Sequence, residues 1–297
     1  MYNISIIVLN YNSTEDTISC VNKINSFAGG YHIIVVDNCS PDNSFDIIQK
    51  HFRGDHNVDV IKTGSNDGYS SGNNFGIKFA ISKYNSEIVG IINPDVVLSN
   101  KDNIDVLAKI LMSNEDYGII GGRAVNYYGN DSLRYSAWDI PTNIGILVNL
   151  SNALRNRQFL THIEKVSDNL VQVDCVAGCY FLAKTEAMKN VDFFDEGTFL
   201  YNEENILAIR MKRAGYKELI ALDQKYLHNH KPEPKGRIPF QKAVSGSPVS
   251  YDSKKYMVKK YYSSLLLPLM WLVEQTNKVY GFARYIYRII KYTRDAS

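Results

Sequence analysis

The chain contains little cysteine, and its cysteines do not have the pattern of a structural zinc site. Only 4 of the 297 residues are Cys, and they are Cys20, Cys39, Cys175 and Cys179. The last two enclose three residues, whereas zinc-binding pairs usually enclose two, and no cluster of paired His residues accompanies them. We therefore expect buried, reduced thiols in a cytoplasmic protein.

Secretion signals, spanning segments and common nucleotide motifs are also missing. The segment Met1–Asn12 has neither the charged region nor the small-residue cleavage site of a signal peptide. No run reaches the ~20 apolar residues that a membrane-spanning helix needs. The glycine-rich segments match neither the Walker A motif nor G-x-G-x-x-G, so neither an ATPase nor a nicotinamide enzyme is supported.

Excess charge is lacking in the chain as a whole, although the charge is unevenly distributed. The formal net charge is +2, but residues 251–297 hold nine Lys and Arg against three Asp and Glu. The mildly acidic remainder argues against a bulk nucleic-acid binder, and we expect no nucleic-acid partner. With 45% hydrophobic and 22% charged residues, the composition is that of one large α/β domain with an appendage.

Short β-branched runs alternate with helical patterns through the first 230 residues. Strands are expected at 4–9, 32–36, 58–62, 88–92, 118–124, 171–183 (interrupted near Gly178) and 218–222. Helices are expected at 13–26, from 45, and at 73–83, 104–112, 184–189 and 204–214. This alternation predicts βαβ units and a mostly parallel sheet. Residues 126–169 show no assignable pattern.

Asp95 follows a run that has the character of a central strand. Ile88–Ile92 is short, apolar and β-branched, as in a strand buried on both faces. Pro94 ends the strand, so Asp95 lies at its carboxyl end, where open α/β sheets bind ligands. The carboxylate either binds a divalent cation together with substrate phosphates or stabilises a β-turn. The stretch itself leaves both interpretations open.

Two further groups of polar residues are candidates for chemistry. Glu203 and Glu204 stand at the start of a predicted helix, where ionised carboxylates are favoured. They either act on a substrate or complement the helix end. His228 and His230 follow the last predicted strand and are either part of a metal or diphosphate site or surface residues. Residues 231–252 have the composition of a mobile loop.

Six segments, in the correct order, resemble the family-two glycosyltransferases. They are I-S-I-I-V-L-N-Y-N at 4–12, V-V-D-N-C-S-P-D at 35–42, N-D-G-Y-S-S-G-N-N-F-G at 66–76, I-N-P-D at 92–95, G-C-Y-F-L-A-K at 178–184 and F-D-E-G-T-F-L-Y-N-E-E at 194–204. The branch that the chain resembles most is the bacterial rhamnosyltransferase-like enzymes of capsule, O-antigen and wall polysaccharide synthesis. The resemblance covers about residues 1–230.

The resemblance implies the α/β glycosyltransferase A fold, with a single Rossmann-like, mostly parallel central sheet flanked by helices and followed by a C-terminal helical tail. It also implies a nucleotide-sugar donor, dTDP-rhamnose or a UDP-hexose, and inverting transfer to a saccharide or lipid-linked saccharide. The donor-binding positions become Asn10, Asp37 (toward the nucleobase), Asn38, Asn66, Gly68, Tyr69, Asn73 and Asn93. Gly178 and Cys179 fall on the acceptor side.

By the same resemblance, Asp95 and the diphosphate oxygens would hold Mg²⁺ or Mn²⁺, and Glu204, paired with Glu203, would be the base. Two positions depart from the family pattern. Glu204 replaces the usual Asp, and Ile206 stands where a second acid is common. The rival interpretations are an inactive donor-binding scaffold and a nucleotidyltransferase. A nucleotidyltransferase usually has a basic, glycine-rich loop near its N-terminus, and this chain has none there.

The resemblance defines a catalytic domain, and the composition and residue pattern that follow it indicate a loop and a tail. The domain covers 1–230, with a nucleotide half (about 1–125) and an acceptor half (about 126–230), the loop covers 231–252 and the tail 253–297. In the tail Val279, Phe282, Ile286 and Ile289 recur at helical spacing on one side, and Arg284, Arg288 and Lys291 on another. This pattern predicts a helix on an anionic membrane surface, at the inner face of the cell membrane. The alternative is that its apolar face packs on the catalytic domain or on a second subunit of a homodimer.

Overall fold

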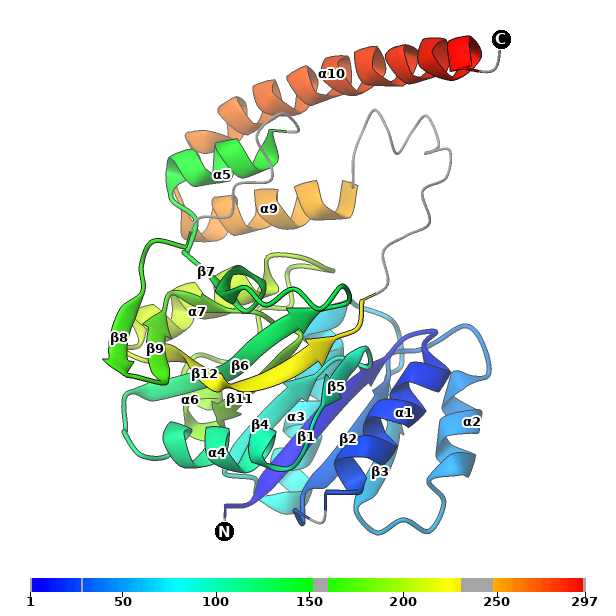
Figure 1. Ribbon diagram of the computed structural model, residues 1–297, viewed down its shortest axis with the longest axis vertical. Coiled ribbons are helices and arrows are strands. Elements are labelled where there is room, and N and C mark those ends of the chain that lie inside the picture. The colour runs from blue at the N-terminus through cyan, green and yellow to red at the C-terminus, as the bar shows by residue number, and fades with distance from the viewer. Residues whose placement is uncertain (1, 28, 152–159, 231–247, 296–297) are drawn as a thin grey trace. The chain divides into compact units, whose positions relative to one another are not determined.

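The computed structural model describes residues 2–27, 29–151, 160–230 and 248–295 (Figure 1). The chain divides into two compact units. The first, here called the sheet unit, comprises Met1–Ile140, Leu160–Phe199 and Glu203–Lys231. The second, the helical unit, comprises Pro141–Phe159, Leu200–Asn202 and Pro232–Ser297. Each unit is described by itself.

A twisted sheet forms the centre of the sheet unit (Figure 1). Its strand order is β3 (Val58–Lys62), β2 (His32–Asp37), β1 (Ile4–Asn10), β4 (Ile88–Ile92), β11 (Tyr180–Lys184), β6 (Tyr117–Asn126), β12 (Lys217–His228), β9 (Leu170–Val173) and β8 (Glu164–Ser167), with β5 (Val96–Leu98) paired to β12. The first four strands are parallel, as the βαβ pattern predicts, and β6 is parallel to β12. Strand β11 runs antiparallel between β4 and β6.

Helices cover both faces of this sheet. One face packs against α1 (Thr14–Asn25), α2 (Ser44–His51) and α4 (Asp102–Leu111). The other packs against α3 (Tyr69–Tyr84), α6 (Thr185–Asn190) and α7 (Glu203–Arg213). Strand β4 contributes alternate side chains to the two hydrophobic cores, so the prediction of a strand buried on both faces is confirmed.

The start of α3 was predicted one helical turn too late. The glycine- and asparagine-rich stretch was expected to remain a loop as far as Asn73, but α3 begins at Tyr69. Gly68 precedes the helix with φ 100°, and a Cβ at this residue would lie 2.2 Å from the carbonyl oxygen of Phe199. A glycine is therefore required here for the backbone to turn into the helix beside Phe199.

Other boundaries also differ from the sequence expectation. Strand β12 extends to His228, well beyond the predicted 218–222. The unassigned middle contains a short 3₁₀ turn (Leu133–Tyr135), β7 (Ala137–Trp138), which pairs with β10 (Cys175–Val176), α5 (Asn143–Leu150) and β8. Residues 248–252, expected in the mobile loop, belong to α9, and residues 231–247 lie outside the described part of the chain.

The helical unit consists of α5, α9 (Pro248–Tyr261) and α10 (Leu266–Asp295). The Tyr262 hydroxyl donates to the carbonyl of Pro141 (2.7 Å), and the Asn277 side-chain amide donates to the carbonyl of Leu150 (2.8 Å). Met257 and Met270 are fully buried. These contacts join the tail to α5, which is far from it in sequence. Among the helices described here, none is long and apolar enough to cross a membrane.

Candidate active site

The turn that carries Asp95 is fixed on both sides. Within the turn, the Val96 amide donates to the carbonyl of Asn93 (3.0 Å), as expected for a β-turn with Pro94 at its second position. The Asn93 amide donates to the carbonyl of Cys179 (2.9 Å), just before β11. Asp95 therefore projects from the carboxyl end of β4 on a rigid loop.

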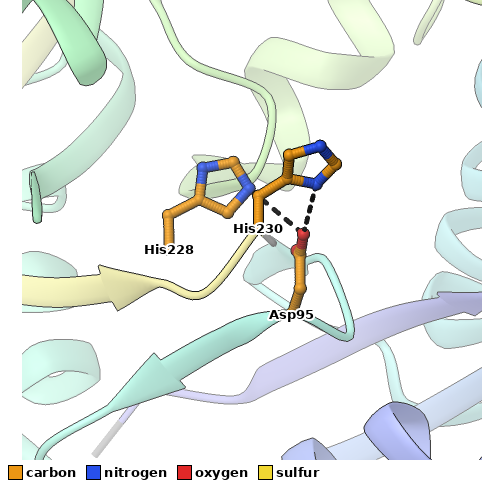
Figure 2. A group of neighbouring side chains, drawn as sticks. All are labelled: Asp95, His228 and His230. Carbon is orange, nitrogen blue, oxygen red and sulfur yellow. Dashed lines mark hydrogen bonds and ion pairs between the residues drawn. The ribbon is translucent and has the colours of Figure 1, made fainter. Parts of the chain in front are cut away.

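Two histidines converge on Asp95 (Figure 2). Its Oδ2 lies 3.4 Å from Nε2 of His228 and 3.2 Å from Nδ1 of His230. The approach follows from the sheet, because β5 pairs with the end of β12 and places His228 opposite Val96. The backbone amide of Asn229 also donates to the carbonyl of Asp95 (2.8 Å).

In this cluster the two imidazoles stabilise the charged form of the Asp95 carboxylate. Burial alone would raise the pKa of Asp95, but hydrogen bonds and charge from His228 and His230 bring it below its ordinary value. The hydrogen bond with Asp95, followed by one with Cys179, raises the pKa of His228 to about 10. The ligand atoms of the three side chains lie within 4.8 Å of one another. Asp95 Oδ1 is buried and has no hydrogen-bond partner in the described residues, so these side chains fit a divalent cation.

Glu203 and Glu204 begin α7, and both are held in a poorly solvated environment. Burial, and next the charge of Glu204, raises the pKa of Glu203 to about 9. Burial also raises the pKa of Glu204, although the backbone N–H groups of Glu204 itself and then of Gly178 favour the charged form and oppose this. The sequence led us to expect that the helix N-terminus would favour ionisation. The backbone N–H groups of Glu203 and Glu204 at this helix start do lower the pKa of both acids, but the loss of hydration on burial raises it by more.

Gly178 connects this acid pair to the end of β4. Its carbonyl oxygen lies 2.8 Å from the hydroxyl of Tyr69, and the same hydroxyl lies 3.1 Å from Oδ1 of Asn93. The next residue, Cys179, has its Sγ 3.2 Å from the hydroxyl of Tyr226 and contacts His228. The structure thus brings together the predicted acceptor-side, base and metal residues.

A second group of predicted residues orders the loop before α3. The Asn38 side-chain amide donates to Oδ1 of Asn66 (3.0 Å) and to the carbonyl of Gly68 (3.2 Å). Asn66 Oδ1 also accepts from the Gly68 amide (3.1 Å). Asn73 is fully buried one turn into α3, and its Oδ1 has no partner among the residues described.

Asp37 and Asn10 lie deeper, at the ends of β2 and β1. Both are fully buried, and the side-chain amide of Asn10 donates to Oδ2 of Asp37 (2.7 Å). The Ser40 amide donates to Oδ1 of Asp37 (3.0 Å). Both carboxylate oxygens are thus engaged within the protein. Contact between Asp37 and a nucleobase stays a prediction.

A second cluster of potential ligands, Asp139, His162 and Asp174, is already satisfied by the protein. Asp139 accepts from the backbone amides of Thr161 and His162, each at 3.0 Å. Asp174 accepts from Lys212 Nζ (2.8 Å) and lies 3.0 Å from Nδ1 of His162. These contacts join the two points where the chain leaves and re-enters the sheet unit, so we assign the cluster a structural role.

Comparison of the sequence with family models identifies the family. The model described as "Glycosyl transferase family 2" matches residues 5–187, which include Asp95 and Gly178. The chain belongs to glycosyl transferase family 2. The resemblance drawn from its six motifs is therefore confirmed at the level of the family.

A curated relative of this family 2 chain is the low-salt glycan biosynthesis hexosyltransferase Agl10 of Haloferax volcanii, which is 30% identical over 213 residues. The match covers 71% of this chain and 62% of the relative. The chain therefore spans less than two thirds of the length of that protein.

Three solved structures share the fold. GalNAc-T7 with UDP, GalNAc and Mn²⁺ has a TM-score of 0.62 at 14% identity, covering 86% of this chain and 48% of its own. Mannosyltransferase PcManGT of Pyrobaculum calidifontis with GDP-Man and Mn²⁺ has a TM-score of 0.55 at 12% identity, covering 97% and 88%. TarS of S. aureus with UDP-GlcNAc has a TM-score of 0.53 at 16% identity, covering 96% and 71%. These likenesses show the glycosyltransferase A fold that was predicted.

One buried acid of this family 2 chain was missed by the sequence analysis. Glu218 lies in β12, is 4% exposed, and accepts a hydrogen bond from the backbone amide of Val176 (2.7 Å). Burial raises its pKa to about 8. The signal was present in the sequence, because a lone Glu interrupts the apolar run at the start of a predicted strand.

Proposed function

We propose that this chain is an inverting glycosyltransferase that moves a sugar from a nucleotide-sugar donor to a saccharide or lipid-linked saccharide during synthesis of a surface polysaccharide. The observation that carries the proposal is that two candidate sites meet at the carboxyl end of the central strand β4. Asp95, flanked by His228 and His230, lies at the end of β4, and Gly178 links that strand end to Glu204.

The donor side of the proposal rests on the ordered loop before α3. Asn38, Asn66 and Gly68 are held to one another by hydrogen bonds, which pre-organises the backbone that a nucleoside diphosphate would contact. The structural neighbours with UDP, UDP-GlcNAc or GDP-Man support a nucleotide-sugar donor. We propose dTDP-rhamnose or a UDP-hexose as the donor.

Asp95 is the proposed cation ligand, together with His228 and His230. One carboxylate and two imidazoles are a mixed oxygen and nitrogen donor set, which suits Mn²⁺ better than the all-oxygen preference of Mg²⁺. The Mn²⁺ in two structural neighbours supports this choice. When bound, such a cation neutralises negative charge on the leaving nucleoside diphosphate.

Glu204 is the proposed general base. A sugar hydroxyl is a weak nucleophile, so a carboxylate must accept its proton as the new glycosidic bond forms. Gly178 packs closely against the Glu204 carboxyl group, and burial raises the pKa of Glu204, which makes this carboxylate a stronger base. Attack from the side opposite the diphosphate inverts the configuration at the sugar carbon.

A donor panel tests this function. The full chain is incubated in Mn²⁺ with dTDP-rhamnose, UDP-galactose, UDP-glucose, UDP-N-acetyl sugars and GDP-mannose, and saturable binding and donor hydrolysis are measured. We expect one donor to bind selectively and to be slowly hydrolysed without an acceptor. Selective binding without hydrolysis, and without transfer to any saccharide or lipid-linked acceptor, would instead indicate an inactive scaffold. Failure of every donor to bind would overturn the proposal.

We further propose that α10 attaches the enzyme to an anionic membrane surface. Its exposed apolar residues Leu269, Leu272, Val279 and Ile286 are spaced by three or seven positions, so they form one stripe along the helix. Leu266 and Met270, on another side, are buried in the helical unit. The apolar face of α10 is therefore only partly used by its own unit.

Charge favours a lipid surface as the occupant of this stripe. Residues 251–297 carry a net formal charge of +6, and each basic residue near an anionic surface adds about 1 kcal/mol of attraction. A second copy of the chain would bring the same positive charge and be repelled. A lipid-linked acceptor at the inner face of the membrane would then be held close to the enzyme.

A further inference from the structure

Glu218 lies at a position that the sheet pattern assigns to an apolar side chain. It shares a face of β12 with the fully buried Ile220 and is paired with Val173 of β9 and Ile119 of β6. That face packs against α7 through a hydrophobic core. Burying a carboxyl group among apolar side chains is unfavourable unless it makes compensating hydrogen bonds.

The hydrogen bond that Glu218 makes is to the segment that carries Gly178. Its Oε2 accepts from the Val176 amide at 2.7 Å, while its Oε1 has no partner within the described residues. One residue later, the Ala177 amide donates to the carbonyl of Ser136 (2.8 Å). Glu218 and the Ser136 carbonyl therefore hold two successive amides immediately before Gly178.

The held segment touches three parts of the candidate active site. Gly178 lies against the Glu204 carboxyl group, because a Cβ at Gly178 would be 2.8 Å from Oε1 of Glu204, and the Gly178 carbonyl accepts from the Tyr69 hydroxyl (2.8 Å). The Cys179 carbonyl accepts from the Asn93 amide in the turn before Asp95. A shift of this segment would thus move Gly178 away from the Glu204 carboxyl group. It would also weaken the hydrogen bond that holds the turn carrying Asp95.

We propose that Glu218 is a positioning residue, whose carboxyl group anchors the Val176 amide and so fixes Gly178 against the Glu204 carboxylate. The proposal rests on the function proposed above. It assigns to Glu218 no contact with substrate and no proton transfer. What it requires is an acceptor oxygen at this place, not a negative charge.

Two substitutions separate the acceptor from the charge. Glu218→Gln keeps a carbonyl oxygen for the Val176 amide and cannot ionise, whereas Glu218→Met keeps a similar volume and removes the acceptor. We expect Glu218→Gln to retain kcat within about 3-fold. Glu218→Met should lose roughly 10- to 100-fold in kcat, as expected for a displaced catalytic group, with an unchanged KM for the donor. Thermal unfolding of both variants confirms that each is folded.

A second readout does not require turnover. Labelling with 1-¹³C-alanine and ¹⁵N-glycine selects amides that follow an Ala–Gly bond, and this chain has three, at Gly29, Gly178 and Gly215. The Gly178 signal should shift with pH as Glu204 ionises, and Glu204→Gln identifies it by abolishing that shift. We expect the titration to persist in Glu218→Gln and to be lost in Glu218→Met, with the Gly29 signal unchanged.

The outcomes distinguish the two proposals. Wild-type kcat and a normal Gly178 titration in Glu218→Met would overturn the positioning role. Equal impairment of Glu218→Gln and Glu218→Met would also overturn it, because the charge and not the acceptor would then matter. If the wild-type protein turns over no donor, the proposed function fails, while the Gly178 titration still decides whether Glu218 positions this segment.

Discussion

The backbone of Gly178 and the carboxyl group of Glu204 are in direct contact. A Cβ built on Gly178 would lie 2.8 Å from Oε1 and 2.9 Å from Cγ of Glu204. These distances are too short for a side chain at position 178 while Glu204 keeps this position, so glycine allows the Glu204 carboxyl to lie against the backbone. Gly178 and Glu204 are 26 positions apart in sequence, and their contact sets the orientation of the proposed base.

Gly178→Ala should therefore impair transfer without unfolding the protein. The new methyl group would meet the flexible end of Glu204, which can rotate away, so the chain can still fold. We expect kcat to fall roughly 10- to 100-fold, because the base would be displaced, while donor affinity is kept. Gly64→Ala is the matched control, since a Cβ there meets no atom within 4 Å. Unchanged kcat in Gly178→Ala would contradict the importance of this contact.

Substitution of each acid by its amide should identify the base. Glu204→Gln keeps the size of the side chain but cannot accept a proton, so turnover should fall by roughly two to four orders of magnitude. Donor affinity, measured by calorimetry, should be nearly unchanged. Glu203→Gln should retain more activity, because only Glu204 is contacted by Gly178 in the described structure. The reverse ranking would show that the assignment is off by one residue.

Glu203 should make the protein less stable as the pH rises. Its pKa is raised from 4.5 to about 9 in the folded state. Below pH 4.5 the acid is protonated in both states; between the two pKa values only the unfolded state loses the proton, so the free energy of unfolding decreases. Glu203→Gln should remove this part of the pH dependence and raise Tm by several degrees at pH 8.5, but not at pH 4.

The control for this measurement is Glu15→Gln. Glu15 is also in the first turn of a helix, α1, but it is exposed. Its replacement should change Tm little at either pH. A Glu203→Gln protein whose advantage over wild type is the same at pH 4 and pH 8.5 would show that burial does not suppress ionisation of this group.

The two histidines should differ in importance for cation binding. The His228 side chain is 30% exposed and contacts both Asp95 and Cys179, whereas that of His230 is 76% exposed. We expect Asp95→Ala to abolish transfer and Mn²⁺ binding, His228→Ala to weaken Mn²⁺ binding strongly, and His230→Ala to weaken it less. Titration calorimetry with Mn²⁺ measures this order. Exposed His56 gives the matched control, and full activity in EDTA would refute a cation requirement.

The sequence predicted the position of Asp95 better than its surroundings. Asp95 was found because an apolar run and a proline mark the end of a central strand. Its partners His228 and His230 were expected to lie beyond a strand that ends at Leu222. Strand β12 instead extends six residues further and includes His228. The pairing of β5 with β12, which brings the histidines to Asp95, depends on contacts about 130 residues apart that no local pattern encodes.

Burial was the second property that the sequence did not reveal. Glu203 and Glu204 were recognised from their place before a helix, but their raised pKa values come from tertiary packing. Glu218 was passed over because the apolar run around it predicts a strand, and the anchoring of Val176 emerges only when β10 folds beside β12. The tail was predicted as helical, but its packing on α5 was not foreseen.

Membrane attachment is best tested by substitutions in α10 of the full chain. Truncation before Lys254 would cut through α9, whose Ser253 hydroxyl donates to the carbonyl of Leu200 (2.8 Å). Leu272→Glu with Val279→Glu instead places two charges on the exposed stripe, at side chains that are 52% and 71% exposed. Because each buried apolar side chain contributes about 1.5–3 kcal/mol, binding to phosphatidylglycerol vesicles should weaken at least about 10-fold.

The control and the salt dependence decide what occupies the stripe. Ile47→Glu alters a similarly exposed apolar residue of α2 (50% exposed) and should leave vesicle binding unchanged. Wild-type binding should be weaker on phosphatidylcholine and should decrease with salt, since screening reduces attraction between the basic tail and the anionic surface. Equal sedimentation of wild-type and doubly substituted protein with the vesicles would refute attachment through α10. If the wild type is instead a dimer without lipid, and the substitutions make it a monomer, the stripe is a subunit interface.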